Sequence, residues 1–302
     1  MTAYEVSRRE FLVRSSSTAA LFAAGAVLVA CGGSSPTTSG QTALERLKSQ
    51  GYARVGFANE APFDYATSDG KLTGSEPETA RLILKKLGVN EIDGVLTEFG
   101  SLIPGLIAKR FDMVAAGMFI NPTRCKQVAF SNPTFGIGEG MMVRKGNPLN
   151  LHSYADVAAN PNVKFGEVSG GVETGYATAA GVKQSQVVTF PDGPTALAGL
   201  QAGRIDGFTL STISLQSLLD RANDPNLEAA TPWTDPTVNG KSVKGYGGFT
   251  FRKEDTDLVD AFNAQLAAIV KDGTWAATVK PFSLTPAFLP EATVTSASLC
   301  AG

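Results

Sequence analysis

Residue patterns that carry catalysis are scarce in this chain of 302 amino acids. Histidine occurs once, as His152, and it has no partner at a spacing suited to metal binding or to a nucleophile–base pair. We expect a surface or capping role for it. The sequence contains neither a GxxxxGKS/T phosphate loop nor a dinucleotide-binding fingerprint, and no acidic pair stands out for acid–base work. These absences disfavour catalysis, and we expect no catalytic residue, no metal and no cofactor.

An excess of charge of one sign is also lacking. The chain carries 26 Lys and Arg against 28 Asp and Glu, which leaves a net charge of −2. This balance does not indicate a basic surface, so we expect no nucleic-acid partner. Hydrophobic residues make up 43% and charged residues 18%, as in ordinary globular proteins. The length allows one large domain or two lobes, because a domain usually takes ~100–200 residues.

The apolar stretch near the start of the chain, residues 18–30, is shorter than the ~20 residues that a membrane-spanning helix needs. It follows Arg8-Arg9 in SRREFL, so residues 1–30 resemble a twin-arginine export signal. The stretch ends in LVAC, which resembles a bacterial lipobox with the lipid on Cys31. Residues 32–40 are poor in apolar side chains, so 31–43 is expected to be a flexible tether. We expect a periplasmic or cell-surface protein, anchored to the membrane by lipid alone.

Two cysteines remain in the exported part, Cys125 and Cys300. An even pair in an oxidising compartment suggests a disulfide, which would tie the C-terminal tail to the body of the protein. The alternative is two buried free thiols.

The order of elements predicts an α/β fold from residue 44 onward, because strands alternate with amphipathic helices. Helices are expected at 78–87, 102–110 and 257–272, and a strand at 112–120. GLIAKRFD (105–112) is echoed by GLQAGRID (199–206), which indicates that one structural unit occurs twice. We therefore expect two lobes.

The course of the chain between the lobes is suggested by two similar segments, MMVRKGNP (141–148) and FTFRKEDT (249–256). We interpret them as crossing strands. They would give a first lobe of residues 44–145 and 247–302 and a second lobe of 146–246. Two crossovers imply a hinge and a ligand cleft between the lobes, and we expect a monomer.

Aromatic and charged residues gather where strands of the first lobe end. The strand at 55–58 runs into Glu60 and Phe63, while Phe99 and Phe119 follow other apolar stretches, and Arg124 comes after a turn. Ligands of such sheets bind beyond the carboxyl ends of the strands. Ring faces attract cations, and a guanidinium grips a carboxylate. We expect an aromatic box for a zwitterion with a delocalised cation; the alternative for each ring is core packing.

In the second lobe, a glycine turn at 170–173 precedes a predicted helix. The backbone N–H groups of this turn could bind an anion at the helix N-terminus. The alternative is a plain glycine turn without a binding role.

The segments 101–133 and 249–275 resemble the bacterial extracellular solute-binding proteins of family 3, which serve ABC importers of amino acids and related compounds. The resemblance covers residues 44–282 and implies a two-lobed type II periplasmic-binding-protein fold and ABC permease subunits as partners. Arg124 matches the family's carboxylate-binding arginine. ANEAPF (58–63), Phe99 and Phe119 are similar to the ectoine/hydroxyectoine-binding branch. The implied ligand-binding residues are Glu60, Phe63, Phe99, Phe119, Asn121, Arg124, Gly171, Val172 and Ser211.

Three alternatives remain. The first is a receptor for a cationic or aromatic amino acid. TLSTIS (209–214), however, offers only hydroxyls where amino-acid binders carry an aspartate, and Phe119 stands where they carry a small hydroxyl residue. The second is a periplasmic dehydratase, an enzyme that shares the fold. The third is a sensor ectodomain, for which no signalling domain is apparent in this sequence.

Overall fold

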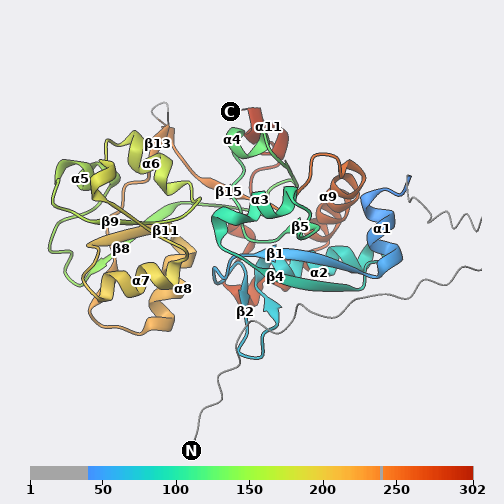
Figure 1. Ribbon diagram of the computed structural model, residues 1–302, viewed down its shortest axis with the longest axis horizontal. Helices are drawn as coiled ribbons and strands as arrows, with labels where there is room; N and C mark the ends of the chain where they lie inside the picture. Colours follow the sequence, from blue (N-terminus) through green and yellow to red (C-terminus); the bar gives the residue numbers. More distant parts are fainter. Residues whose placement is uncertain (1–39, 239–240, 302) are drawn as a thin grey trace, which may run out of the picture. The chain divides into compact units, whose positions relative to one another are not determined.

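The computed structural model describes residues 40–238 and 241–301, and two five-stranded sheets form its framework (Figure 1). The first sheet has the order β4 (Glu91–Leu96), β1 (Tyr52–Phe57), β5 (Met113–Val114), β16 (Thr250–Phe251) and β6 (Ala129–Phe130). The second has the order β10 (Val187–Phe190), β9 (Phe165–Val168), β11 (Gly207–Ser211), β8 (Glu139–Arg144) and β12 (Leu227–Ala229). In both, the fourth strand runs antiparallel to its neighbours. The predicted two-lobed α/β fold is confirmed.

The echoed octapeptides occupy equivalent places in the two sheets. Residues 105–112 lead from α3 (Leu102–Ile107) into β5, and residues 199–206 lead from α7 (Gly193–Gln201) into β11. β5 lies beside β1, and β11 lies beside β9. The repeated sequence therefore marks the return from a helix to the third strand of each lobe.

Helices cover both sheets. Those packed with the first lobe are α1 (Ala43–Gln50), α2 (Ser75–Lys86), α3, α4 (Pro122–Cys125), α9 (Thr256–Lys271), α10 (Thr274–Val279) and α11 (Ser296–Ala301). Those packed with the second are α5 (Tyr154–Ala159), α6 (Glu173–Ala179), α7 and α8 (Thr212–Ala222). Short 3-10 turns are η1 (Phe99–Ser101), η2 (Gln184–Gln186), η3 (Lys280–Phe282) and η4 (Pro286–Phe288).

The long helix α9 shows why the amphipathic pattern was informative. Leu258, Phe262, Leu266 and Ile269 recur every three or four residues, and all four are buried. The Phe262 ring packs against Phe251 of the first sheet, with centroids 5.3 Å apart. Burying each large apolar side chain contributes about 1.5–3 kcal/mol, so one helix face ties α9 to the sheet. Its bounds differ from the predicted 257–272 by one residue.

The crossing between the lobes differs from the sequence-based expectation. The strands that pair between the two sheets are β7 (Phe135–Ile137) and β15 (Gly245–Gly247). The predicted crossing segments instead enter separate sheets, since β8 belongs to the second and β16 to the first. Their shared Arg-Lys ending reflected local similarity and not a shared position. We accordingly propose lobe boundaries near residues 137 and 246, which moves residues 138–145 into the second lobe.

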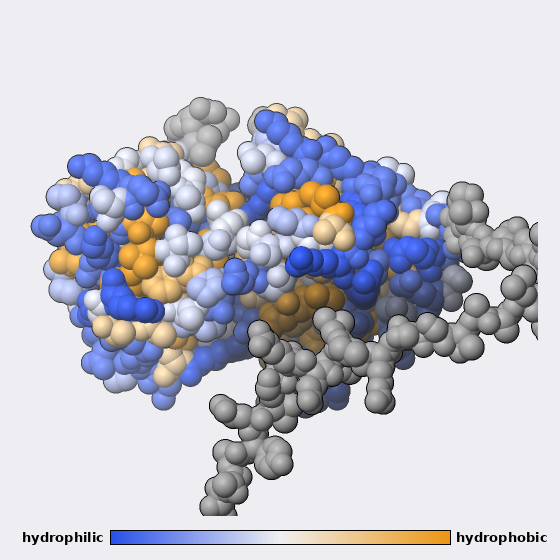
Figure 2. Space-filling model, viewed as in Figure 1, coloured by the Kyte–Doolittle hydropathy of each residue, from blue (hydrophilic) through white to orange (hydrophobic). Residues whose placement is uncertain are grey.

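Two small hairpins complete the strands, β2 (Tyr65–Ala66) with β3 (Leu72–Thr73) and β13 (Thr237–Val238) with β14 (Lys241–Ser242). On the face shown in Figure 2, hydrophilic residues predominate, and the hydrophobic patches are separate from one another. No helix in the described part of the chain combines the length and the hydropathy that crossing a membrane requires. The expected signal peptide, Cys31 and residues 31–39 of the tether lie outside the described residues.

Candidate functional site

The first part of the site is built by a tight turn after β1. Asp64 is fully buried, and its carboxylate accepts a hydrogen bond from the backbone N–H of Ala58 at 2.6 Å. The backbone N–H of Asp64 donates to the carbonyl oxygen of Glu60 at 3.0 Å. Burial raises the pKa of Asp64 well above its usual range. These bonds fold residues 58–64 back on themselves, so Glu60 and Phe63 line a cavity beside the end of β1.

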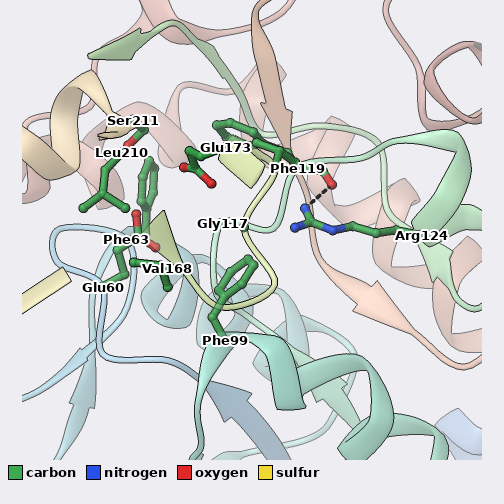
Figure 3. Close-up of a pocket in the computed structure, with 12 residues that line it drawn as sticks. Glu60, Phe63, Phe99, Gly117, Phe119, Arg124, Val168, Glu173, Leu210 and Ser211 are labelled. Carbon is green, nitrogen blue, oxygen red and sulfur yellow. Dashed lines mark hydrogen bonds between the residues drawn. The ribbon is translucent and has the colours of Figure 1, made fainter. Parts of the chain in front are cut away.

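Three phenylalanine rings form the apolar side of this cavity (Figure 3). Phe63 is 2% exposed and stacks on Phe135, with ring centroids 4.5 Å apart. The ring of Phe119 meets the Phe135 ring edge-on, with centroids 6.2 Å apart. A Cβ on Gly245 would lie 1.9 Å from the Phe119 ring. Phe99 begins η1, and its ring points toward the centre of the close-up (Figure 3). The core-packing alternative thus holds in part for Phe63, which serves both the core and the cavity.

Arg124 is held on the short helix α4 with its guanidinium toward the cavity. The side chain of Asn121 caps this helix by accepting a hydrogen bond from the backbone N–H of Arg124 at 2.9 Å. Nη1 of Arg124 donates to the carbonyl oxygen of Phe119 at 2.7 Å, the dashed line in Figure 3. Nη2 donates to the carbonyl oxygen of Gly170 in the second lobe at 2.8 Å. The guanidinium also lies 5.4 Å from the centroid of the Phe99 ring.

Burial lowers the pKa of Arg124 to about 10, so the guanidinium still carries its charge at neutral pH. The residue after it, Cys125, forms a disulfide with Cys300 of α11, with Cα atoms 5.6 Å apart. This is the pairing that the sequence predicted. It fastens the C-terminal helix to the helix that carries Arg124.

The second lobe contributes two helix beginnings. Glu173 is the first residue of α6 and is 6% exposed. In the view of Figure 3, its carboxylate lies between Phe119 and the ring of Phe63. The hydroxyl of Ser214, in the first turn of α8, donates to Oε1 of Glu60 at 2.7 Å and so crosses between the lobes. Burial raises the pKa of Glu60, while the Ser214 bond and Arg124 act in the opposite direction. Burial also raises the pKa of Glu173, to about 7.

These side chains line a small inner cavity of about 40 Å³. Eight of the nine residues expected to bind ligand line it: Glu60, Phe63, Phe99, Phe119, Arg124, Gly171, Val172 and Ser211. The ninth, Asn121, caps α4 and lines a wider outer cavity that also contacts Tyr176 and Tyr246.

Four further residues line the cavity that were not among the nine expected to bind ligand: Glu173, Gly117, Val168 and Leu210. Of these, Glu173 entered the sequence reasoning only as the end of the glycine turn and, with Glu60, as a carboxyl pair for the dehydratase alternative. Glu173 carried a usable signal. It follows the end of β9, as Glu60 follows the end of β1, and both strands are the second in their sheets. The described residues contain no cluster of three or more His, Cys, Asp or Glu suited to a metal ion. The arrangement offers two carboxylates, one guanidinium and aromatic faces, which suits recognition of a small zwitterion.

Residues 53–284 match the model of the bacterial extracellular solute-binding proteins, family 3. The chain belongs to this family. Of the curated relatives, the probable amino-acid ABC transporter periplasmic-binding protein y4tE of Sinorhizobium fredii is 39% identical over 255 residues, covering 84% of this chain and 82% of the relative. The L-cystine-binding protein TcyJ of Escherichia coli is 30% identical over 259 residues, covering 84% and 91%.

Among solved structures, EhuB in complex with hydroxyectoine is 41% identical, with a TM-score of 0.78, and the match covers 87% of this chain and 100% of that one. The family 3 chain described here is therefore an extracytoplasmic solute-binding protein of an amino-acid-type ABC transporter. Its curated relatives are binding proteins and not enzymes, in line with the scarcity of catalytic patterns.

Proposed function

We propose that this protein binds ectoine, hydroxyectoine or a closely similar zwitterion and delivers it to the permease subunits of an ABC importer. The observation that carries the proposal is the composition of the inner cavity, where three phenylalanines and two carboxylates share a small space with one guanidinium. A ring-shaped delocalised cation with a carboxylate matches these groups. The similarity to EhuB, solved with hydroxyectoine, supports the same ligand class.

In this proposal Arg124 holds the ligand carboxylate, because a guanidinium pairs with a carboxylate through parallel hydrogen bonds. The faces of Phe63, Phe99 and Phe119 hold the cationic ring. Glu60 neutralises the cation from the first lobe, and Glu173 faces the same cavity from the second. The apolar Val172 and the hydroxyl of Ser211 shape the wall of the second lobe.

The rival function is a receptor for a cationic or other amino acid, which the relatives y4tE and TcyJ favour. A thermal-shift panel separates the two. A tight ligand at 100–1,000 times its Kd stabilises the folded state by roughly 3–4 kcal/mol. We expect ectoine or hydroxyectoine to raise the melting temperature more than arginine, cystine or histidine. A shift produced by an ordinary amino acid alone would favour the rival.

We also propose that Arg8-Arg9 direct export and that lipid on Cys31 anchors the mature protein. The motifs SRREFL and LVAC support this. Cys31→Ala should release the protein from the membrane fraction without changing its fold. Retention of the variant in that fraction would contradict the lipid anchor.

A further inference from the structure

Another buried carboxylate lies behind the wall of the inner cavity. Strands β8 and β11 pair so that Glu139 stands directly opposite Ser211. Side chains directly opposite one another on antiparallel strands project from the same face of the sheet. Ser211 lines the inner cavity, so Glu139 lies one strand away from the wall of that cavity.

The Glu139 carboxylate has no partner within the described part of the chain. The residue is 2% exposed, and neither Oε1 nor Oε2 accepts a hydrogen bond there. Only its backbone is held, because its N–H donates to Oδ1 of Asp235 at 3.1 Å. No Lys, Arg or His side chain of the described residues forms an ion pair with it. An unpaired buried charge is costly, so this carboxylate needs either a proton or a cation.

The groups around Glu139 include four further carboxyls. Arg124 supplies the positive charge of the inner cavity, and its two terminal nitrogens are already donating to carbonyl oxygens. The titratable and polar groups that face this region from the packed elements are Glu60, Glu167, Glu173, Asp235, Tyr154, Tyr176, Thr209, Ser211 and Ser214. Carboxyls that are buried in one region and repel one another do not all ionise, and their titrations are coupled.

We propose that Glu139 is a specificity-determining residue that acts together with Glu60 and Glu173, and that a cationic ligand binds with release of a proton from these three carboxyls. The inference rests on the proposed function in one respect, since it requires a ligand with a positive charge. The ligand cation supplies the missing counter-charge, so one carboxyl that is neutral in the empty cavity becomes ionised when the ligand arrives. The proton leaves to solvent, and no covalent bond changes.

The direction of titration agrees with this. Burial and the neighbouring acidic groups raise the pKa of Glu139 well above its usual range, and burial raises that of Glu173 to about 7. A bound cation lowers these pKa values. Binding should therefore strengthen as pH rises toward 8, by up to about tenfold per pH unit for one proton released.

The test is calorimetric titration with ectoine and, separately, with L-arginine between pH 5.5 and 8.5, in buffers of different ionisation enthalpy. We expect release of about one proton per ligand below neutral pH. Glu139→Gln should remove at least half of this release and flatten the pH profile, and Glu139→Asp should restore it. Glu228→Gln is the matched control, since Glu228 pairs with Lys145 at 2.8 Å on β12. It should bind and release protons as the wild type does.

The outcomes are distinct. Binding of ectoine without proton release would overturn this inference and leave the proposed function standing, whereas binding of L-arginine alone without proton release would overturn both. Proton release that Glu139→Gln leaves unchanged would overturn the role of Glu139, even if that variant melts at a lower temperature. Proton-linked binding of L-arginine alone would overturn the ectoine proposal and support this inference. Failure of both probes to bind would overturn both. If Glu139→Gln does not fold, the number of protons released per bound ligand is compared between the wild type and Glu139→Asp, and release by neither would overturn the inference.

Discussion

Gly100 of the first lobe and Gly170 of the second lie against each other across the cleft. A Cβ on Gly170 would lie 2.5 Å from Cα of Gly100, closer than two non-bonded carbon atoms can approach. The neighbouring bond from Arg124 to the carbonyl oxygen of Gly170 and the bond from Ser214 to Glu60 also join the two lobes. The two lobes are thus closed around the inner cavity. Their contact at Gly100 requires that residue 170 has no side chain.

Gly170→Ala is expected to weaken ligand binding by about tenfold or more, because ~1.4 kcal/mol of clash in the closed state is enough for that change. Gly146→Ala is a matched control. Both glycines have left-handed backbones, with φ of +78° and +79°, but a Cβ on Gly146 meets nothing within 4 Å. Calorimetry should show weaker binding for the Gly170 variant alone, and small-angle scattering should show it more open. Equal loss of affinity in both variants would mean that backbone strain, not closure, is responsible.

Ser214→Ala removes a donor to the Glu60 carboxylate across the cleft. A hydrogen bond to a charged group is worth about 1.5–3 kcal/mol, so we expect the Kd to rise by roughly tenfold to a hundredfold. The melting temperature without ligand should change little if the open state predominates there. Ser217→Ala, three residues farther along α8, is the control. Unchanged affinity in Ser214→Ala would show that this bond does not contribute to the bound state.

Replacing phenylalanine by leucine should distinguish a ring that contacts the ligand from a ring that packs in the core. Phe99→Leu keeps apolar area and loses the ring face, so binding should weaken by roughly threefold to thirtyfold with little change in melting temperature. Phe63→Leu also disrupts the stack on Phe135, so it should lower both affinity and melting temperature. If Phe99→Leu binds as tightly as the wild type, its ring is not part of the cage.

Removing the disulfide should affect binding as well as stability. Cys125 directly follows Arg124, and the bridge joins residues 175 positions apart. Cys125→Ser with Cys300→Ser should cost about 2–4 kcal/mol of stability and weaken binding severalfold by loosening α4. In an Arg124→Ala background the same change should leave residual affinity unaltered. Additive losses of affinity would show that the bridge does not act through Arg124.

Glu76 should make stability depend on pH. It is 1% exposed, the hydroxyl of Thr134 donates to it at 3.3 Å, and burial raises its pKa to about 8. The neutral form is therefore favoured in the folded state, and its contribution to stability is lost as pH rises from about 4.5 to 8. Glu76→Gln should be more stable than the wild type at pH 8, by roughly 3–5 kcal/mol, and similar at pH 4.5.

Urea denaturation at the two pH values measures the effect, with Glu78→Gln on the same helix as the control. A Glu76→Gln variant that is less stable than the wild type at pH 8 would contradict the raised pKa.

Glu60, Phe63, Phe99 and Arg124 each stand beside turn residues at a strand or helix boundary, which is the local signal from which the sequence predicted them, and the structure gathers them around one cavity. It failed where position depends on tertiary pairing. The expected strand 112–120 is regular only over Met113–Val114, because the chain leaves the sheet and turns at Gly117, where φ is +57°.

The second lobe was harder to predict because its contacts form only when the lobes close. Nothing local in TLSTIS indicates that the hydroxyl of Ser214 reaches a glutamate 154 residues away. The unpaired Glu139 was invisible for a similar reason, since its position opposite Ser211 follows from strand register. The residue types indicate which chemistry is possible, whereas the register of the strands and the closure of the lobes determine which side chains come into contact.

The central claim is that the inner cavity selects a zwitterion with a ring-shaped delocalised cation. Its most direct test is calorimetric titration of the purified mature protein at pH 8 with ectoine and hydroxyectoine, beside L-arginine, L-cystine and L-histidine. We expect ectoine or hydroxyectoine to bind with one-to-one stoichiometry at least a hundredfold more tightly than any of the three amino acids, a difference of about 2.8 kcal/mol. Tight binding of an amino acid, with no measurable binding of either ectoine, would contradict the claim.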